Sequence, residues 1–412
     1  MASRATDVTD PRDPACDPDP YPAYAKLREE APVWRLPLPN GLVAWMVTRY
    51  EDVRLVLGDQ RFGRDLGKAP GRWPRGRRPP SEDAHRLFGK GLLNVDPPDH
   101  TRLRRLVSRE FGPRRVEELR PRVQAITDDL LDRIAPLGRA DLIADLALPL
   151  PVLVICELLG VPFEDRHAFR EWSNAIVLFS RRRVAGDLEA AQRGLRRYLE
   201  GLIEDKRRRP ADDLLSALVA LREEGDRLSD DELLAMAALL LIAGHETTVN
   251  LIGNGMLALL QHPAELAALR ADPSLVPSAV EELLRFDGPV ETATWRLALE
   301  PVELHGHRIE PGDLVIPALA AANHDPERFP DPDRLDVRRD DAGHVAFGHG
   351  VHFCLGAPLA RLEGQIALAG ILRRLPDLTL AVPVAELKWR RSMIRGLESL
   401  PVTFTPSGGV NG

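Results

Sequence analysis

Apolar residues recur every three or four positions through most of residues 100–286, and this period predicts amphipathic helices of ordinary length. Strand-like runs are short and lie in GLVAWMVTR near the start and in TWRLALEPVELHGHRIEPGDLVIPALAAA, where Gly and Pro interrupt brief extended segments. No Pro/Ser-rich linker separates the helical part from the stranded part. The pattern therefore predicts a mainly α protein with a minor β portion, in which residues 21–406 form one domain between tails at 1–20 and 407–412.

The segment LSDDELLAMAALLLIAGHETTVNLIGNGMLALLQHP predicts one helix with an unusual interior. It is apolar on all sides from Leu233 to Ala243, but the polar run GHETT follows well before the roughly 20 apolar residues that a membrane span needs. Burying Glu246 costs several kcal/mol unless its charge is paired, hydrated or neutralised. Two interpretations remain open: a surface turn at a helix break, or a kink beside a small ligand, where Gly244 leaves room and a Thr hydroxyl bonds back to a carbonyl.

Charged residues are plentiful and balanced, with 55 Lys and Arg against 62 Asp and Glu, and the net charge of -7 gives no signal for nucleic-acid binding. The N-terminus carries acids and prolines, so we expect neither a signal peptide nor a membrane anchor. Three cysteines cannot cross-link 412 residues, which is consistent with a reducing compartment and a cytoplasmic protein. Cys156, among Val, Ile and Leu at helical spacing, is expected to be a buried small hydrophobe.

Two further charged groups depend on helical spacing. Glu282 and Arg285 stand three residues apart in AVEELLRFDGPV, where a solvated ion pair is the simpler interpretation. In DPPDHTRLRRLVSREFGPRRVEELRPR, Arg far outnumbers Glu, and such a patch can face an anionic cofactor, an acidic protein or solvent. His100 and Arg104 are four residues apart there, so they share a helix face and can bind one anionic group together.

The order of four motifs, HTRLR, AGHETT, ExxR and FGHGVHFCLG, resembles the cytochrome P-450 superfamily of haem-thiolate monooxygenases. The last motif, residues 347–356, is called the Cys loop below, and it matches the family pattern FxxGxxxCxG at every fixed position. The resemblance runs from YPAYAKLREEAPV to MIRGLESLPVTF. The phrases DPPDHTRLRRLVSREF, AGHETTVNLI and FGHGVHFCLGAPLARLE are most similar to soluble bacterial enzymes of the actinomycete branch that hydroxylates macrolides, other polyketides and sterol-like molecules.

This resemblance implies a cytochrome P-450 fold, in which haem b lies between a long distal helix and the proximal Cys loop. Cys354 fits the axial thiolate, which pushes electron density onto the iron and favours O–O cleavage. Gly348 and Gly356 let the backbone wrap closely around the sulfur and aim N–H groups at it, while Phe347 packs beside the loop and excludes water. The family positions that hold the haem propionates correspond to His100, Arg104, Arg296 and His352.

The ExxR motif implies a structural role for Glu282 and Arg285, which the family buries as a pair that supports the Cys loop from behind. Arg328 in PERF is the candidate third partner of that pair. The family segment A/G-G-x-D/E-T corresponds to Ala243, Gly244, Glu246 and Thr247. In the family this acid and alcohol deliver protons during oxygen activation, so the intact pair implies an oxygen-activating enzyme. His245 stands at the variable position and receives no role.

The implied activity is the insertion of one atom of dioxygen into a bulky, largely apolar macrolide, polyketide, terpenoid or steroid, usually by C–H hydroxylation. Epoxidation or oxidative coupling at the same haem, and a non-catalytic haem protein for sensing or recruitment, are the alternatives. Since no reductase-like segment is visible, we expect electrons from a separate ferredoxin and an NAD(P)H-dependent reductase. The protein is expected to be a monomer, and the arginines expected to dock the ferredoxin are Arg102, Arg105 and Arg109.

Family positions also indicate the substrate pocket. Its expected segments are the Arg-rich loop from Gly63 to Leu93, residues 172–179, and residues 290–294. The single residues that we expect to line it are Leu239, Leu240, Ala243, Val290, Thr292, Thr294, Met393 and Ile394. The arginines that can attract a carboxylate-bearing substrate, or simply lie in a solvated loop, are Arg72, Arg75, Arg77 and Arg78.

Overall fold

The computed structural model describes residues 10–11, 16, 18–37, 43–68, 81–162, 165–177, 185–223, 226–340, 343–390 and 394–407. The longer helices are α1 Tyr21–Glu30, α2 Tyr50–Gly58, α4 Asp99–Ser108, α6 Arg120–Ile134, α7 Pro149–Leu158, α8 Arg166–Val177, α9 Ala185–Arg208, α11 Asp230–Gln261, α12 Pro263–Ala271, α13 Val276–Asp287 and α15 Ala357–Arg374. The shorter helices are α3 Glu82–Phe88, α5 Pro113–Glu118, α10 Leu214–Ala220 and α14 Leu319–Asn323.

The long predicted helix forms without interruption as α11. The Ser229 hydroxyl accepts a hydrogen bond from the Glu232 N–H, and the Glu232 carboxylate accepts one from the Ser229 N–H, so a capping box starts the helix. The helix runs through GHETT, which contradicts a surface turn at that point. Although α11 is long and apolar enough to cross a membrane, 72% of its most apolar window is buried inside the protein, as expected of a core helix.

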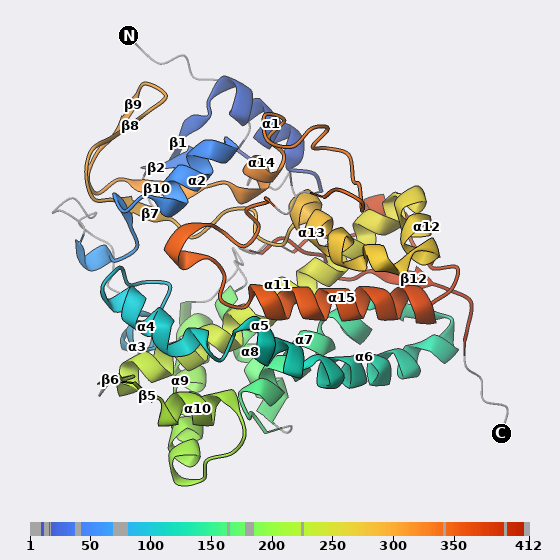
Figure 1. Ribbon diagram of the computed structural model, residues 1–412, viewed down its shortest axis with the longest axis horizontal. Helices are drawn as coiled ribbons and strands as arrows, with labels where there is room; N and C mark the ends of the chain where they lie inside the picture. The colour runs from blue at the N-terminus through green and yellow to red at the C-terminus, as the bar shows by residue number, and fades with distance from the viewer. Residues whose placement is uncertain are drawn as a thin grey trace.

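Helix α11 is the centre of the helical packing. It contacts α3, α7, α9, α13 and α15, and α15 in turn packs along α6 (Figure 1). The apolar faces of these helices form one large core, in which Cys156 is fully buried, as predicted. This packing fixes the position of α11 relative to α15, and the Cys loop immediately precedes α15.

The strands form a minor part, as predicted, and the main sheet has the order β1-β2-β10-β7-β3. Its strands are β1 Val33–Pro37, β2 Val43–Val47, β10 Leu314–Pro317, β7 Arg296–Ala298 and β3 Phe62–Gly63. Strand β2 pairs antiparallel with β1, with Val33 opposite Val47, and parallel with β10, with Leu314 opposite Ala44. The sheet lies with α1, α2 and α14 at the upper left of Figure 1, while the other helices occupy the lower and right-hand parts.

Short strands complete the fold. The three-stranded sheet contains β11 Thr379–Leu380, β12 Pro401–Thr403 and β4 Arg139–Asp141. The two hairpins are β5 Arg222–Glu223 with β6 Asp226–Arg227, and β8 Val302–Leu304 with β9 His307–Ile309. Strand β12 ties residues near the C-terminus to the end of α6 through β4, so the helical core is closed by a segment distant in sequence.

Candidate functional site

A cavity lies between the middle of α11 and the Cys loop. It encloses about 1380 Å³, counting the part that opens to solvent. The wall residues from α11 are Leu239, Leu240, Ala243, Gly244, Thr247 and Thr248. Those from the Cys loop and the start of α15 are Phe347, Gly348, His349, His352, Phe353, Cys354, Leu355, Gly356, Leu359, Ala360 and Glu363. The fold thus brings face to face two motifs that lie far apart in the sequence.

The Cys loop is closed by a hydrogen bond in which the Cys354 N–H donates to the Phe347 carbonyl at 2.9 Å. Gly348 and Gly350 have φ angles of +74° and +73°, which L side chains rarely adopt. A Cβ at Gly350 would also lie 2.7 Å from a carbonyl oxygen of α2. At Gly356, by contrast, φ is -83° and a Cβ would meet no protein atom within 4 Å. Glycine is therefore required by backbone geometry at 348 and 350, while protein packing imposes no such requirement at 356.

The surroundings of Cys354 shift the pKa of its thiol in opposite directions. Burial raises the pKa of the Cys354 thiol, whereas hydrogen bonds from the backbone N–H groups of Gly356 and Ala357 lower it. The positive charges of Arg104 and Arg361 also lower the pKa of this thiol. Ala357 begins α15, so the partial positive charge of the helix N-terminus points at the sulfur. Coordination to a metal ion would complete the deprotonation.

Four cationic or potentially cationic side chains gather in the same cavity: His100, Arg104, Arg296 and His352. The His100 and His352 rings have centroids 4.2 Å apart, and burial together with the neighbouring positive charges lowers the pKa of His352 to about 3. Burial lowers the pKa of Arg296 to about 10. Both ring nitrogens of His100 are buried without a hydrogen-bond partner in the part of the chain that the structure describes. An anionic group between these residues would satisfy His100 and relieve the mutual repulsion.

The acid of the GHETT run is buried and paired. The Glu246 carboxylate lies 3.7 Å from the Arg390 guanidinium through one oxygen and 3.7 Å from His245 Nε2 through the other. The Thr247 hydroxyl donates to the Ala243 carbonyl at 3.1 Å, which is the back-bonded geometry expected from the sequence. Thr247 lines the cavity and Glu246 lies behind it, so any exchange of protons between Glu246 and the cavity would need a relay.

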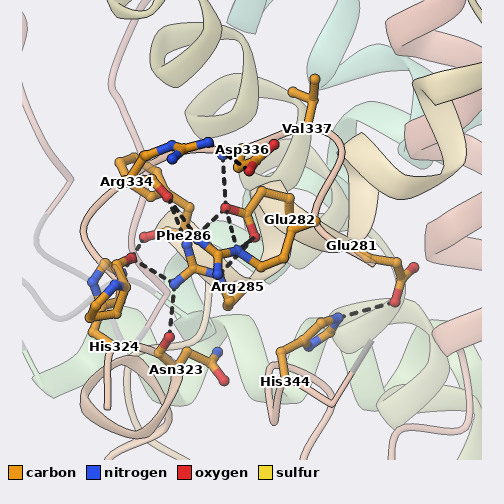
Figure 2. A network of polar contacts seen from close by, with 12 residues as sticks. Glu281, Glu282, Arg285, Phe286, Asn323, His324, Arg334, Asp336, Val337 and His344 are labelled. Atoms are coloured by element: carbon orange, nitrogen blue, oxygen red, sulfur yellow. Dashed lines mark hydrogen bonds and ion pairs between the residues drawn. The ribbon is translucent and has the colours of Figure 1, made fainter. Parts of the chain in front are cut away.

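The Glu282–Arg285 pair is buried rather than solvated. Both side chains are 1% exposed, and Arg285 binds the carboxylate of Glu282 with two hydrogen bonds of 2.7 and 2.8 Å. The same guanidinium donates to the carbonyls of Asn323 and Pro332, as Figure 2 shows for the contact with Asn323. The Asn323 side chain accepts the N–H of Val345, two residues before the Cys loop. The pair is thereby linked to the start of the Cys loop.

The third charged group on Glu282 is Arg339, and the prediction of Arg328 was wrong. Arg339 Nε lies 3.2 and 3.1 Å from the two carboxylate oxygens of Glu282. Arg328 instead stacks over the Phe329 ring, with its guanidinium carbon 4.8 Å from the ring centroid. The irregular segment that follows α14 decides which arginine turns inward, and no local spacing predicts its path.

Comparison with known proteins decides the family. A sequence model described as Cytochrome P450 matches residues 23–376. The chain belongs to the cytochrome P450 family. It is 54% identical over 390 residues to cytochrome P450 monooxygenase PikC of Streptomyces venezuelae, covering 94% of this chain and 91% of that protein. It is 51% identical over 390 residues to the vitamin D(3) 25-hydroxylase of Pseudonocardia autotrophica, covering 94% of each.

Solved structures agree with this P450 assignment. The Bacillus subtilis bacillaene polyketide synthase P450 PksS superimposes with a TM-score of 0.90 at 41% identity, covering 96% of this chain and 100% of that one. The protein is therefore a haem-thiolate monooxygenase with the P450 fold, as the sequence predicted. The residues present fit the haem: Cys354 lies at the cavity wall, and the unpartnered His100 lies among the cations that an anionic edge of the haem requires.

Some predicted pocket residues of this P450 lie at the cavity and others do not. The predicted single residues found in its wall are Leu239, Leu240, Ala243, Val290 and Thr294, joined by Leu92 and Leu93 from the predicted loop. Thr292 forms a β-bridge with Ala318, and neither Thr292 nor Ile394 belongs to the wall. The predicted pocket residues that lie outside the described part of the chain are Arg72, Arg75, Arg77, Arg78, Phe179 and Met393. Gly244 lines the cavity, but a Cβ there would also lie 3.0 Å from the Ile155 side chain of α7.

Two residues near the P450 site, His245 and Glu281, received no role from the sequence but make polar contacts in the structure. His245 is 1% exposed, and its ring lies 2.7 Å from the Leu241 carbonyl and 3.2 Å from the Ser173 hydroxyl of α8. Burial lowers the pKa of His245. Glu281 binds Arg361 with hydrogen bonds of 2.7 and 2.8 Å and also contacts His344, as Figure 2 shows for the latter. No motif spacing signals the contact of His245 with Ser173 or that of Glu281 with Arg361, because each joins elements distant in the sequence.

The buried ExxR pair yields a stability prediction. Arg285→Lys keeps the positive charge but loses the two-pronged contact with Glu282 and the bonds to the carbonyls of Asn323 and Pro332. Each lost hydrogen bond to a charged group costs about 1.5–3 kcal/mol. We therefore expect a marked loss of folded, haem-loaded protein and a lower Tm. The matched control is Arg115→Lys, because Arg115 and Glu118 have the same spacing but are 46% and 49% exposed. That variant is expected to change stability by about 1 kcal/mol or less. Equal Tm values for the two variants would contradict the structural role of Arg285.

Proposed function

We propose that this P450 inserts one oxygen atom of dioxygen into a bulky, largely apolar macrolide, polyketide, terpenoid or steroid, usually by C–H hydroxylation. The observation that carries the proposal is that Thr247 and Cys354 face each other across one cavity whose distal lining is apolar or small. A site of this kind suits a ligand held by shape and apolar contact, with few polar groups to orient it. The name of one relative, vitamin D(3) 25-hydroxylase, gives a bulky and largely apolar substrate, which is consistent with this proposal.

When bound, the haem supplies oxygen activation and electron transfer, and the protein supplies orientation and protons. Cys354 would hold the haem iron through its thiolate, and the propionates would be held by His100, Arg104, Arg296 and His352. Phe347, which touches the cavity beside Cys354, keeps water from the sulfur. Gly348 and Gly356 belong to the same support, the first through its left-handed backbone and the second through its N–H.

Glu246 and Thr247 are the proposed proton path. The Thr247 hydroxyl donates to the Ala243 carbonyl, so its oxygen remains able to accept a hydrogen bond from a water in the cavity. Glu246 lies next in the chain, paired at 3.7 Å with Arg390, which itself is 19% exposed. We propose that a proton passes from Glu246 through water to Thr247. Gly244, which has no side chain, leaves space at the wall of α11 beside this path.

The proposed electron donors are a separate ferredoxin and its NAD(P)H-dependent reductase. The arginines expected to dock the ferredoxin differ in exposure, and Arg102 is half-buried, with 28% of its side chain exposed. Arg105 and Arg109 are exposed near the end of α4. These two arginines are the proposed docking residues, since an acidic ferredoxin is attracted to exposed positive charge. Charge reversal of Arg105 that left ferredoxin-driven turnover and its salt dependence unchanged would contradict this assignment.

The location, oligomeric state and domain bounds of the protein are also inferred. We infer a cytoplasmic monomer in which residues 21–406 form one haem-thiolate domain, with residues 1–20 and 407–412 as tails. The family match over residues 23–376 and the burial of α11 inside the protein support this view.

Epoxidation and oxidative coupling would use the same residues, so product analysis distinguishes them from hydroxylation.

Proton delivery by Thr247 is tested by measuring how much of the electron supply goes into product and how much into hydrogen peroxide. A substrate is first identified by screening macrolides, other polyketides, terpenoids and steroids for ligand-induced changes in the haem spectrum. We expect Thr247→Ala to divert reducing equivalents to hydrogen peroxide, raising the peroxide-to-product ratio about tenfold or more, because a positioned proton donor contributes about 10²–10⁴ in rate. Thr247→Ser keeps the hydroxyl and is expected to remain coupled. Tight coupling in Thr247→Ala would refute the role.

A further inference from the structure

Arg64, which follows strand β3, is a buried cation that none of the motifs above explains. It is 4% exposed, and its guanidinium is enclosed by three acceptors from two distant segments. Its Nε donates to the Leu93 carbonyl at 2.7 Å, and a terminal nitrogen donates to the Asn94 side-chain oxygen at 3.0 Å. The other terminal nitrogen donates to the Trp295 carbonyl. Three acceptors in a fixed fork are a geometry that a guanidinium can satisfy and an ammonium cannot.

Arg64 remains charged in its buried position. The guanidinium carbon is 4.3 Å from the Trp295 ring centroid, which places the cation over the ring face. Burial, together with the charge of Arg296, lowers the pKa of Arg64 to about 9, so the side chain remains charged at neutral pH. Asp96 offsets part of that charge, and its carboxylate also accepts the Arg64 backbone N–H at 2.8 Å.

The two segments that Arg64 joins are both walls of the cavity. Leu92 and Leu93 line it from the loop between α3 and α4. On the other side, Trp295 immediately precedes Arg296, the first residue of β7, which also lines the cavity. Asn94 donates to the Phe88 carbonyl at 2.7 Å, so the loop is tied to α3 at one end and to Arg64 in its middle.

We propose that Arg64 is a positioning residue for substrate specificity: it holds Leu92 and Leu93 against the cavity and thereby sets which bulky ligands fit. The proposal rests on the cavity being the substrate site, as proposed above. Arg64 contacts neither substrate nor haem in this role and acts through the loop. A ligand large enough to reach the loop therefore depends on Arg64, whereas a ligand confined to the iron does not.

The test compares two azoles that bind haem iron through an imidazole nitrogen and differ in bulk, imidazole and clotrimazole, on purified haem-loaded protein. Dissociation constants come from spectral titration. Arg64→Lys keeps the charge but loses the three-acceptor fork. Since hydrogen bonds to a charged group contribute about 1.5–3 kcal/mol each, we expect clotrimazole affinity to fall about tenfold or more while imidazole affinity stays within about twofold. Asn94→Ala removes one acceptor and is expected to act in the same direction.

Arg61→Lys is the matched control, because Arg61 is three residues away, 42% exposed and paired with Asp59. It is expected to leave both affinities unchanged. If Arg64→Lys binds both azoles like the parent protein, or loses affinity for both by the same factor, the proposal is wrong. If Arg64→Lys fails to load haem, the Asn94→Ala ratio decides by the same criterion. Failure of the parent protein to bind either azole would instead count against the proposed haem cavity itself.

Discussion

An anionic sulfur must be held in a cavity where burial alone favours the neutral thiol, and the arrangement of the proximal half follows from this constraint. The backbone turns at Gly348 and Gly350 in conformations that bring N–H groups and the start of α15 toward Cys354. Behind the loop, the buried Glu282–Arg285 pair reaches Val345 through Asn323. The rigid support and the local electrostatics thus serve one atom, and loosening either would favour a protonated, unligated cysteine.

The rest of the cavity has positive charge at one edge and an apolar wall on the side of α11. Cations from α4, β7 and the Cys loop converge on one edge of the cavity. The ring nitrogens of His100, which have no hydrogen-bond partner among the described residues, indicate an anionic ligand there. The distal wall from α11 is apolar except for its threonines, and the acid Glu246 is kept behind it by Arg390. Positive charge is therefore concentrated at one edge of the cavity, and the wall formed by α11 remains largely apolar.

The sequence predicted what local spacing determines. The helical period predicted α11, and the fixed positions of the Cys loop predicted that Cys354 belongs to the site. Each prediction depends on residues within a single contiguous segment. The sequence did not predict which residues pair with the buried charged side chains. Arg339 rather than Arg328 meets Glu282 because an irregular segment turns it inward, and Arg64 reaches its three acceptors only after a loop and a strand have packed together. Such contacts depend on tertiary packing, which no motif spacing records.

Ligation of the haem iron by the Cys354 thiolate is tested by the absorption spectrum of the reduced, carbon-monoxide-bound protein. We expect the band typical of thiolate-ligated haem in the parent protein and in Cys156→Ala, since Cys156 lies in the helical core away from the cavity. We expect Cys354→Ala to lose that band. Persistence of the band in Cys354→Ala, or its absence from the haem-loaded parent protein, would show that Cys354 does not bind the iron as a thiolate.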